Sequence, residues 1–241
     1  MLYSGKDLRK LIIPLIIEQI LAIAVGMADT IMVSAAGEAA VSGVSLVDTV
    51  NILLINVFSA LATGGAVVSG HFLGKKKRED ACKSAWQILL FATLLAFVIS
   101  VIFITAHDPL LRLMFGKIED DVMKASKTYL IITTYSFVAL AIYNSCAALF
   151  RAMNESKVTM WVSLLMNVIN VVGNAICIYG LHMGVAGVAI PTTISRYVAA
   201  VVIFLLMFQT KKEINLCGQI TWKFNGCLLY TSPSPRDVEE S

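Results

Sequence analysis

The carboxylate of Asp29 stands late in an otherwise apolar stretch, LAIAVGMADTIMVSAAG at 21–37. A second carboxylate, Glu18, lies eleven residues earlier, and at about 100° per residue the two share one helix face. Amide, hydroxyl and guanidinium groups recur later at helical spacing: Ser163, Asn167, Asn170, Asn174, Thr192 and Arg196. Carboxylate, amide and hydroxyl groups supply only oxygen ligands. Such ligands suit a hard monovalent cation or a titrating proton, and not zinc or copper.

Motifs of enzymes and of cofactor sites are missing from the sequence. Neither HExxH nor GxSxG occurs, and the residues before Lys75 lack the spacing of a phosphate-binding loop. The five cysteines are scattered without a close pair, which predicts neither a disulfide framework nor a zinc site. We therefore expect no catalytic residues, no cofactor, and no metal ion other than Na⁺ at the site around Asp29.

The composition is typical of a membrane protein. Of the 241 residues, 58% are hydrophobic and only 15% are charged, against roughly a quarter charged in an ordinary soluble domain. The mean hydropathy is +0.79. The formal charge is +3 and no basic stripe carries interleaved aromatic residues, so nucleic acid is not an expected partner.

Six segments are long and apolar enough to cross a lipid bilayer, which takes roughly 20 residues per helix. They are 11–33, 46–73, 86–106, 128–150, 158–180 and 185–208. We therefore predict an all-α, polytopic membrane protein with six transmembrane helices. The loop at 107–127 is amphipathic in places and is expected to lie at the outer interface.

Basic residues in the loops predict the orientation. Thirteen Lys and Arg residues fall on the side that holds both ends of 1–226, and four fall on the opposite side. Because cytoplasmic loops carry the excess of basic residues, we expect both ends of 1–226 in the cytoplasm. The remaining residues, 227–241, turn abruptly polar and rich in Pro and Ser. We interpret 227–241 as a non-native or disordered tail outside the transmembrane lobe 1–226.

Helix length gives the depth of the polar groups at 1.5 Å per residue. Asp29 lies about 28 Å of helix from Lys10, and Asn174 lies about 25 Å from Lys157. The helix that carries Thr192 enters the membrane from the outer side, and Thr192 lies about 10 Å below the outer end of this helix. We therefore expect Asp29, Asn170, Asn174 and Thr192 at one level in the outer part of the membrane.

Charged groups at membrane depth are costly and indicate function by default. We favour a functional role for Asp29, because contacts between helices do not require a charge. Glu18 and Arg196 form a candidate intramembrane charge pair, and for that pair a structural and a functional role both stay open. Asn167 and Ser163 are favoured as hydrogen-bonding contacts between helices.

Several stretches resemble multidrug and toxic compound extrusion (MATE) transporters. GMADTIMVSAAGEAAVSGVSLVD resembles their first helix and the following loop, and ALATGGAVVSGHFLGKKK resembles the end of their second helix. ALFRAMNESKVTM and NVINVVGNAICIYGLHMGVAGVAIPTTISR resemble their fourth to sixth helices. The resemblance covers about 1–225 in order, and it is closest to bacterial members.

The resemblance implies two six-helix lobes, of which this chain matches the N-terminal one. It also implies a bacterial cytoplasmic membrane protein that exports drugs or organic cations in exchange for Na⁺ or H⁺ and requires its C-terminal lobe. The family's cation site falls on Asp29, Asn170, Asn174 and Thr192. Asn174 stands where some relatives have an acidic residue, which leaves Na⁺ or H⁺ open. Pro191 stands where many have Ala, so a kink is expected there.

The most direct interpretation is therefore a secondary active antiporter, and not an enzyme. One alternative is a lipid-linked sugar flippase of related fold, which should show several buried basic residues where this sequence has Arg196 alone. A second alternative is a non-transporting membrane scaffold, which predicts no ion-dependent change in stability.

Overall fold

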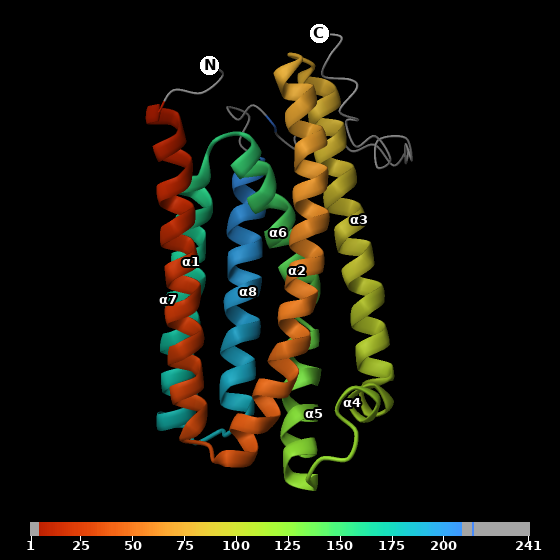
Figure 1. The fold of residues 1–241 in the computed structure, drawn as a ribbon, viewed down its shortest axis with the longest axis vertical. Helices are drawn as coiled ribbons and strands as arrows, with labels where there is room; N and C mark the ends of the chain where they lie inside the picture. Colours follow the sequence, from red (N-terminus) through yellow and green to blue (C-terminus); the bar gives the residue numbers. More distant parts are fainter. Residues whose placement is uncertain (1–4, 209–213, 215–241) are drawn as a thin grey trace.

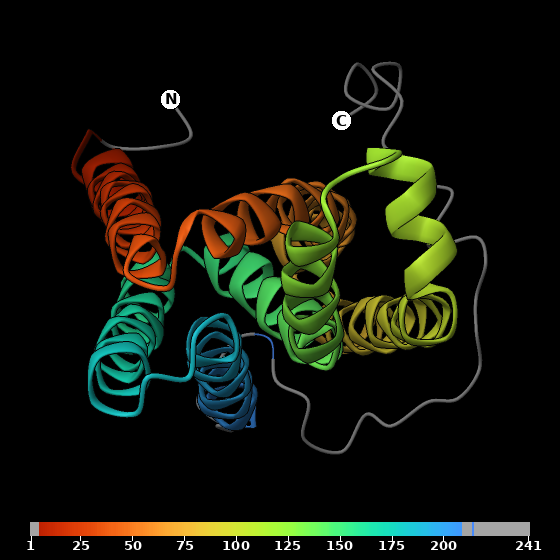
Figure 2. The same ribbon diagram turned by 90° about the horizontal axis from the view of Figure 1, so that it is seen from below.

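The computed structural model describes residues 5–208 and residue 214, and the predicted tail at 227–241 lies outside this part. The described chain is helical, with no β-strand among those residues. Its elements are α1 (Gly5–Ser34), α2 (Glu38–Gly74), α3 (Arg78–Thr105), α4 (His107–Phe115), α5 (Asp120–Thr134), α6 (Phe137–Ala152), α7 (Ser156–Ala175), the π-helical turn η1 (Ile176–Gly180) and α8 (Ala186–Met207). The long helices lie side by side (Figure 1), with α1 against α7 at one edge and α3 at the other (Figure 2).

Membrane-spanning helices account for most of the described chain. Five helices are each long and apolar enough to cross a bilayer, and the bent pair α5 and α6 raises the number to six. Helices satisfy every backbone group internally, which a bilayer requires of a spanning segment. Each predicted span overlaps helical elements of the structure, although 128–150 falls on both α5 and α6 and 158–180 on both α7 and η1. However, α2 begins at Glu38 and α3 at Arg78, each two turns or so before the predicted start.

The predicted span at 128–150 is broken into two helices, α5 and α6, which meet at an angle of 51°. Side chains of α8 donate hydrogen bonds to backbone carbonyl groups around the break. Thr193 Oγ1 donates to Ile132 O at 3.1 Å, and Tyr197 OH donates to Tyr135 O at 2.8 Å. A broken helix is tolerated at membrane depth where neighbouring side chains satisfy the freed backbone groups. α8 therefore holds the bend in place.

A tight turn sends α2 back alongside α1. The turn closes at Gly37, whose φ of +103° lies in a region that residues with a side chain rarely adopt. α2 then starts at once at Glu38, eight residues before the start that we predicted for the second span. Because of this early start, Asp29 on α1 and Asp48 on α2 lie on facing helices.

The predicted interfacial loop at 107–127 contains the short helix α4. Its Leu111 is almost completely buried, in a hydrophobic cluster that also contains Leu130 of α5. The Lys127 ammonium on α5 contacts the Asp108 carboxylate on α4. This hydrogen bond lowers the pKa of Asp108 below its ordinary value. α4 is therefore tied to α5 by one apolar and one ionic contact.

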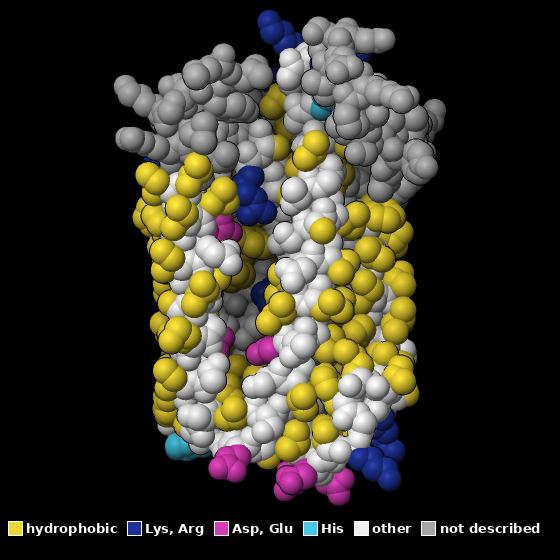
Figure 3. Space-filling view, viewed as in Figure 1, with side chains coloured by type: hydrophobic (Ala, Val, Ile, Leu, Met, Phe, Trp, Pro, Cys, Tyr) yellow, Lys and Arg dark blue, Asp and Glu magenta, His cyan; other side chains and the backbone are white. Residues whose placement is uncertain are grey.

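The surface has the distribution of side chains that a bilayer selects. Hydrophobic side chains cover the flanks of the helices, and charged groups gather near one end, beyond the apolar band (Figure 3). Between α1 and α2 the surface is hollowed, and acidic and basic side chains show inside the hollow (Figure 3). The polar chemistry of the protein is therefore concentrated between these two helices.

Candidate functional site

The four side chains that we expected at one level are neighbours in the structure. Asn174 Nδ2 on α7 donates to Asp29 Oδ1 on α1 at 2.7 Å. Asn170 lies one turn away on α7, and its amide contacts Thr192 Oγ1 on α8 at 2.9 Å. α7 therefore links the carboxylate of α1 to the hydroxyl of α8. That these four side chains bind a cation stays a prediction.

The α7–α8 contact depends on a glycine and a proline. A side-chain carbon on Gly173 would come within 2.6 Å of the Pro191 Cβ, so only glycine permits this approach. Gly173 precedes Asn174 and Pro191 precedes Thr192, so the same contact brings the amides and the hydroxyl together. α8 runs as one helix from Ala186 to Met207 through Pro191, where we expected a kink.

The Asn170 amide has two orientations with different consequences. In one, Nδ2 donates to Thr192 Oγ1, and Oδ1 then lies 3.0 Å and 3.3 Å from the two carboxylate oxygens of Asp29. In the other, Oδ1 accepts from Thr192 Oγ1 and Nδ2 donates to Asp29. Oxygen and nitrogen of an amide are assigned from such contacts. In the first orientation the Asn170 oxygen also accepts from Asn174 Nδ2 at 3.3 Å. The second orientation satisfies both Asp29 and Thr192, and we adopt it for the site without a ligand.

Asn174 offers a further acceptor. Its side chain is fully buried, and its Oδ1 has no hydrogen-bond partner among the residues that the structure describes. A buried acceptor without a partner costs free energy, about 1–3 kcal/mol in typical cases. This oxygen belongs to the amide whose nitrogen donates to Asp29 Oδ1.

Sequence reasoning missed Asp48 on α2. Asp48 and Asp29 line one cavity of about 60 Å³, together with Ser45 and Tyr129. Tyr129 OH donates to Asp48 Oδ1 at 3.0 Å, and Asn51 Nδ2 donates to the same oxygen at 3.2 Å. A cavity of this size has room for a few water molecules or a hydrated ion.

The predicted start of the second span explains the omission. A span that begins at residue 46 places Asp48 at the membrane surface, where a carboxylate is unremarkable. α2 begins at Glu38, so Asp48 lies about 15 Å inside the helix. The residues before Asp48 were the available signal, because the small and apolar side chains at 39–47, AAVSGVSLV, are compatible with a packed transmembrane helix.

The candidate pair of Glu18 and Arg196 is not formed. Arg196 donates from its guanidinium to Ser136 Oγ at the bend between α5 and α6, at 2.9 Å. Glu18 instead forms an ion pair with Arg151 of α6, at 3.9 Å. Depth is the physical reason. Glu18 lies about 16 Å inward of Asp29, whereas Arg196 lies only about 6 Å inward of Thr192.

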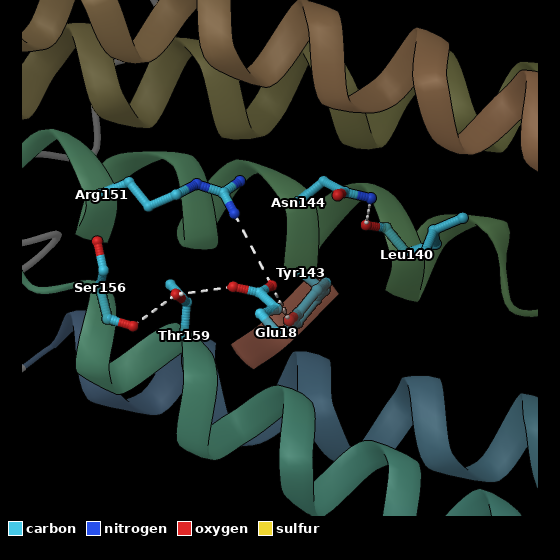
Figure 4. Close-up of polar contacts among 7 residues, drawn as sticks. All are labelled: Glu18, Leu140, Tyr143, Asn144, Arg151, Ser156 and Thr159. Carbon is cyan, nitrogen blue, oxygen red and sulfur yellow. Dashed lines mark hydrogen bonds and ion pairs between the residues drawn. The ribbon is translucent and has the colours of Figure 1, made fainter. Parts of the chain in front are cut away.

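Glu18 belongs to a separate polar cluster, which side chains of α1, α6 and α7 form (Figure 4). Tyr143 OH on α6 donates to Glu18 Oε1 at 3.5 Å, and Thr159 Oγ1 on α7 lies 3.3 Å from Oε2. Figure 4 shows Arg151 reaching the same carboxylate from α6. The cluster joins α1, α6 and α7 by hydrogen bonds, which supports a structural role for Glu18.

Ser163 and Asn167, the two other polar residues of α7 singled out from the sequence, were expected to form hydrogen bonds between helices. Ser163 is buried on α7, and its expected role as a hydrogen-bonding contact between helices stays a prediction. Asn167 is also buried, but its Nδ2 has no hydrogen-bond partner among the described residues. The interpretation of Asn167 as a contact between helices is therefore not supported by a bond from its amide nitrogen.

A family profile described as MatE matches residues 14–176. Among curated proteins, "Uncharacterized transporter YisQ" of Bacillus subtilis is 31% identical over 208 residues, which cover 84% of this chain and 44% of that protein. "Probable multidrug resistance protein NorM" of Thermotoga maritima is 26% identical over 215 residues, which cover 88% and 46%. The chain therefore spans about half the length of the curated relatives it matches.

Solved structures share the fold. A structure described as the outward-facing conformation of a multidrug resistance MATE family transporter superimposes with a TM-score of 0.84 at 23% identity. The match covers 93% of this chain and 49% of that one. A transporter of the MOP superfamily from Pyrococcus furiosus gives a TM-score of 0.85, also at 23% identity. At this identity the similarity establishes the arrangement of helices.

Proposed function

This chain belongs to the MatE family, and from that membership we propose that it is the N-terminal lobe of a cation-coupled exporter of drugs or organic cations. The observation that carries the proposal is the chain of polar contacts from Asp29 on α1 through Asn174 and Asn170 on α7 to Thr192 on α8, which three membrane-spanning helices supply. A carboxylate at such depth costs free energy, so its presence indicates a function by default. The printed name of the Thermotoga maritima relative, a probable multidrug resistance protein, supports the substrate class.

The proposed mechanism is exchange at Asp29. With a cation bound, oxygens of Asp29, Asn170 and Asn174 converge on the ion, and the Asn170 Nδ2 donates to Thr192. When the cation leaves, the Asn170 amide turns, donates to the carboxylate and accepts from Thr192. This rearrangement couples the occupancy of the site to the contact between α7 and α8. The coupling ion is Na⁺ or H⁺, because the ligand set accepts either.

Transport requires a second lobe. Inverted or repeated halves that rock against each other are the usual basis of alternating access. We propose that a C-terminal lobe covers the polar hollow between α1 and α2, where the charged groups of this lobe gather (Figure 3). Both ends of 1–226 are assigned to the cytoplasm in this arrangement, from the distribution of Lys and Arg.

The test is Asp29→Asn in the protein joined to its second lobe. We expect the variant to insert in the membrane at normal levels and to lose efflux of a fluorescent organic cation such as ethidium. Asp121→Asn on the exposed start of α5 removes the same charge and should leave efflux intact. Normal efflux by the Asp29 variant would refute the assignment.

A further inference from the structure

The short helix α4 lies across the long axis of the bundle, whereas the spanning helices lie along it. Figure 1 shows α4 almost end-on, and Figure 2, turned by 90°, shows it lengthwise. It lies at the end of the bundle that holds the turn between α1 and α2, where the apolar band of the surface gives way to charged groups (Figure 3). A helix in this position lies parallel to the membrane plane, at the level of the lipid headgroups.

The side chains of α4 divide between the bundle and its surroundings. Leu111 is almost completely buried, and Phe115, one turn further along, packs against the same hydrophobic cluster. Leu113 and Met114 are instead 83% and 46% exposed, and Leu113 is the most exposed large hydrophobic side chain among the residues that the structure describes. Exposed apolar side chains on a helix at the interface insert between lipid acyl chains. α4 therefore presents an apolar surface to the membrane.

Residues on either side of Leu113 and Met114 line an open cavity with a volume of about 540 Å³. Three of its lining residues are charged: Arg112 in the last turn of α4, Lys117 just after that helix, and Asp120 at the start of α5. The first turn of α5 has no side-chain cap, so its N–H groups add a partial positive charge at the same place. The cavity therefore combines two full positive charges and a helix N-terminus with one carboxylate.

The charges at this cavity are suited to a phosphodiester. Two cations and one carboxylate leave one positive charge, which a phosphodiester with its single negative charge would balance. Arg and Lys are the usual partners of phosphate oxygens, and helix N-termini bind phosphate as well. The neighbouring Lys127 is already paired with Asp108. The remaining charges at 119–124 do not line the cavity.

We propose that this cavity binds the phosphate group of an anionic phospholipid, with Leu113 and Met114 beside its acyl chains. The cations and the exposed apolar side chains occupy adjacent positions on α4, as the headgroup and the acyl chains do in one lipid molecule. This arrangement favours a lipid over a free anion. In the orientation proposed above, the lipid belongs to the outer leaflet. The inference goes beyond the proposed function, because it depends on the position of α4 at the membrane and not on the site of Asp29.

A tryptophan on α4 would report the lipid next to it. Leu113→Trp is made in the full chain after the native tryptophans are replaced by phenylalanine, and the protein is reconstituted in vesicles. Leu113 is exposed, so the larger side chain has room. Lipids with brominated acyl chains quench tryptophan fluorescence on contact. Brominated phosphatidylglycerol mixed with plain phosphatidylcholine is compared with the reverse pairing, and the two degrees of quenching give the relative affinity of α4 for the two lipids. We expect a preference for phosphatidylglycerol.

The charges at the cavity predict how variants change this preference. Arg112→Gln and Lys117→Gln each remove one cation and should lower it roughly fivefold, the size expected for one basic residue at an anionic membrane surface. Asp120→Asn removes the opposing charge and should raise it, a result that damage to the fold would not produce. Lys124→Gln, at an exposed position of α5 outside the lining, is the matched control and should leave the preference unchanged.

Three results would overturn the proposal. Absence of quenching in vesicles of brominated phosphatidylcholine alone would place α4 outside the bilayer. Equal losses of preference in Arg112→Gln and Lys124→Gln would indicate a diffuse surface charge and not a site. Loss of the preference when inorganic phosphate is added at constant ionic strength would assign the cavity to a free anion. None of these results bears on the site of Asp29, because efflux is not measured.

Discussion

At the scale of the residue, the amide groups of α7 determine what Asp29 can bind. Asn174 donates to the carboxylate, and Asn170 faces either Asp29 or Thr192 according to its orientation. Neutral amides add oxygen ligands without adding charge. We therefore propose that a cation site here obtains its neutral ligands from asparagine and threonine and its charge from Asp29.

Asn174→Asp tests this division of roles. The new carboxylate would lie where the amide nitrogen is now 2.7 Å from Asp29 Oδ1, and two carboxylates so close require a cation or a shared proton between them. We expect a lower unfolding midpoint in Na⁺-free alkaline buffer and a steeper rise with Na⁺ or acid than in the parent chain. Asn154→Asp, in an exposed turn, is the control. An unfolding midpoint that changes with neither Na⁺ nor pH would contradict the expectation.

At the scale of the element, two features of α8 position the site. Its Arg196, Thr193 and Tyr197 bond the broken segment between α5 and α6. Its Pro191 packs on Gly173 of α7, which sets the distance between Thr192 and Asn170. α8 thus connects the bend to the cation site, and a change in the packing of α7 on α8 should alter both.

Gly173→Ala is expected to separate α7 from α8, because the added carbon would lie 2.6 Å from the Pro191 Cβ. Overpacking of this kind costs about 1–3 kcal/mol, and the loss of contact between Asn170 and Thr192 should also weaken the cation response. The measurement is the unfolding midpoint with and without Na⁺ and across pH. Gly64→Ala has open space around the new carbon and should be neutral or slightly stabilising, since alanine favours helix. Equal midpoints for the two variants would disprove the close-contact argument.

At the scale of the whole molecule, the bundle has one polar hollow and otherwise apolar flanks (Figure 3). The flanks suit lipid, whereas acidic and basic groups in an open hollow do not. A second lobe over the hollow would remove these groups from lipid and form a cleft between the two halves. This is the physical reason for expecting a lobe beyond the helices described.

The proposed orientation gives a prediction at this scale. A single cysteine at Lys117, in a chain whose native cysteines are replaced by serine or alanine, should react in intact cells with a membrane-impermeant maleimide. A single cysteine at Lys76, in the basic loop between α2 and α3, should react only after the cells are opened. Both positions are exposed, so access is decided by the membrane alone. The reverse pattern would invert the assigned orientation.

The sequence predicted much of the site because its polar groups recur at helical spacing within apolar segments. Asp29, Asn170, Asn174 and Thr192 were selected in this way, and they are neighbours in the structure. Asp48 was missed because we predicted that the second span begins at residue 46, whereas α2 begins at Glu38 and the residues from 39 to 47 are already largely apolar. The break at Tyr135 and Ser136 was also missed, because hydropathy averages over a window and does not detect a bend of 51° in a continuous apolar stretch.

Composition and periodicity by themselves determined the class of fold, the spans and the level of the main polar groups, since these depend on local sequence and on bilayer thickness. Only the tertiary structure decided the partners of the charged residues. Glu18 pairs with Arg151, and Arg196 donates to Ser136 at the bend between α5 and α6. Helical spacing tells which residues share a face of one helix. Which face meets which neighbour, and at what depth, depends on how six spans pack together, and that information is not local to any of them.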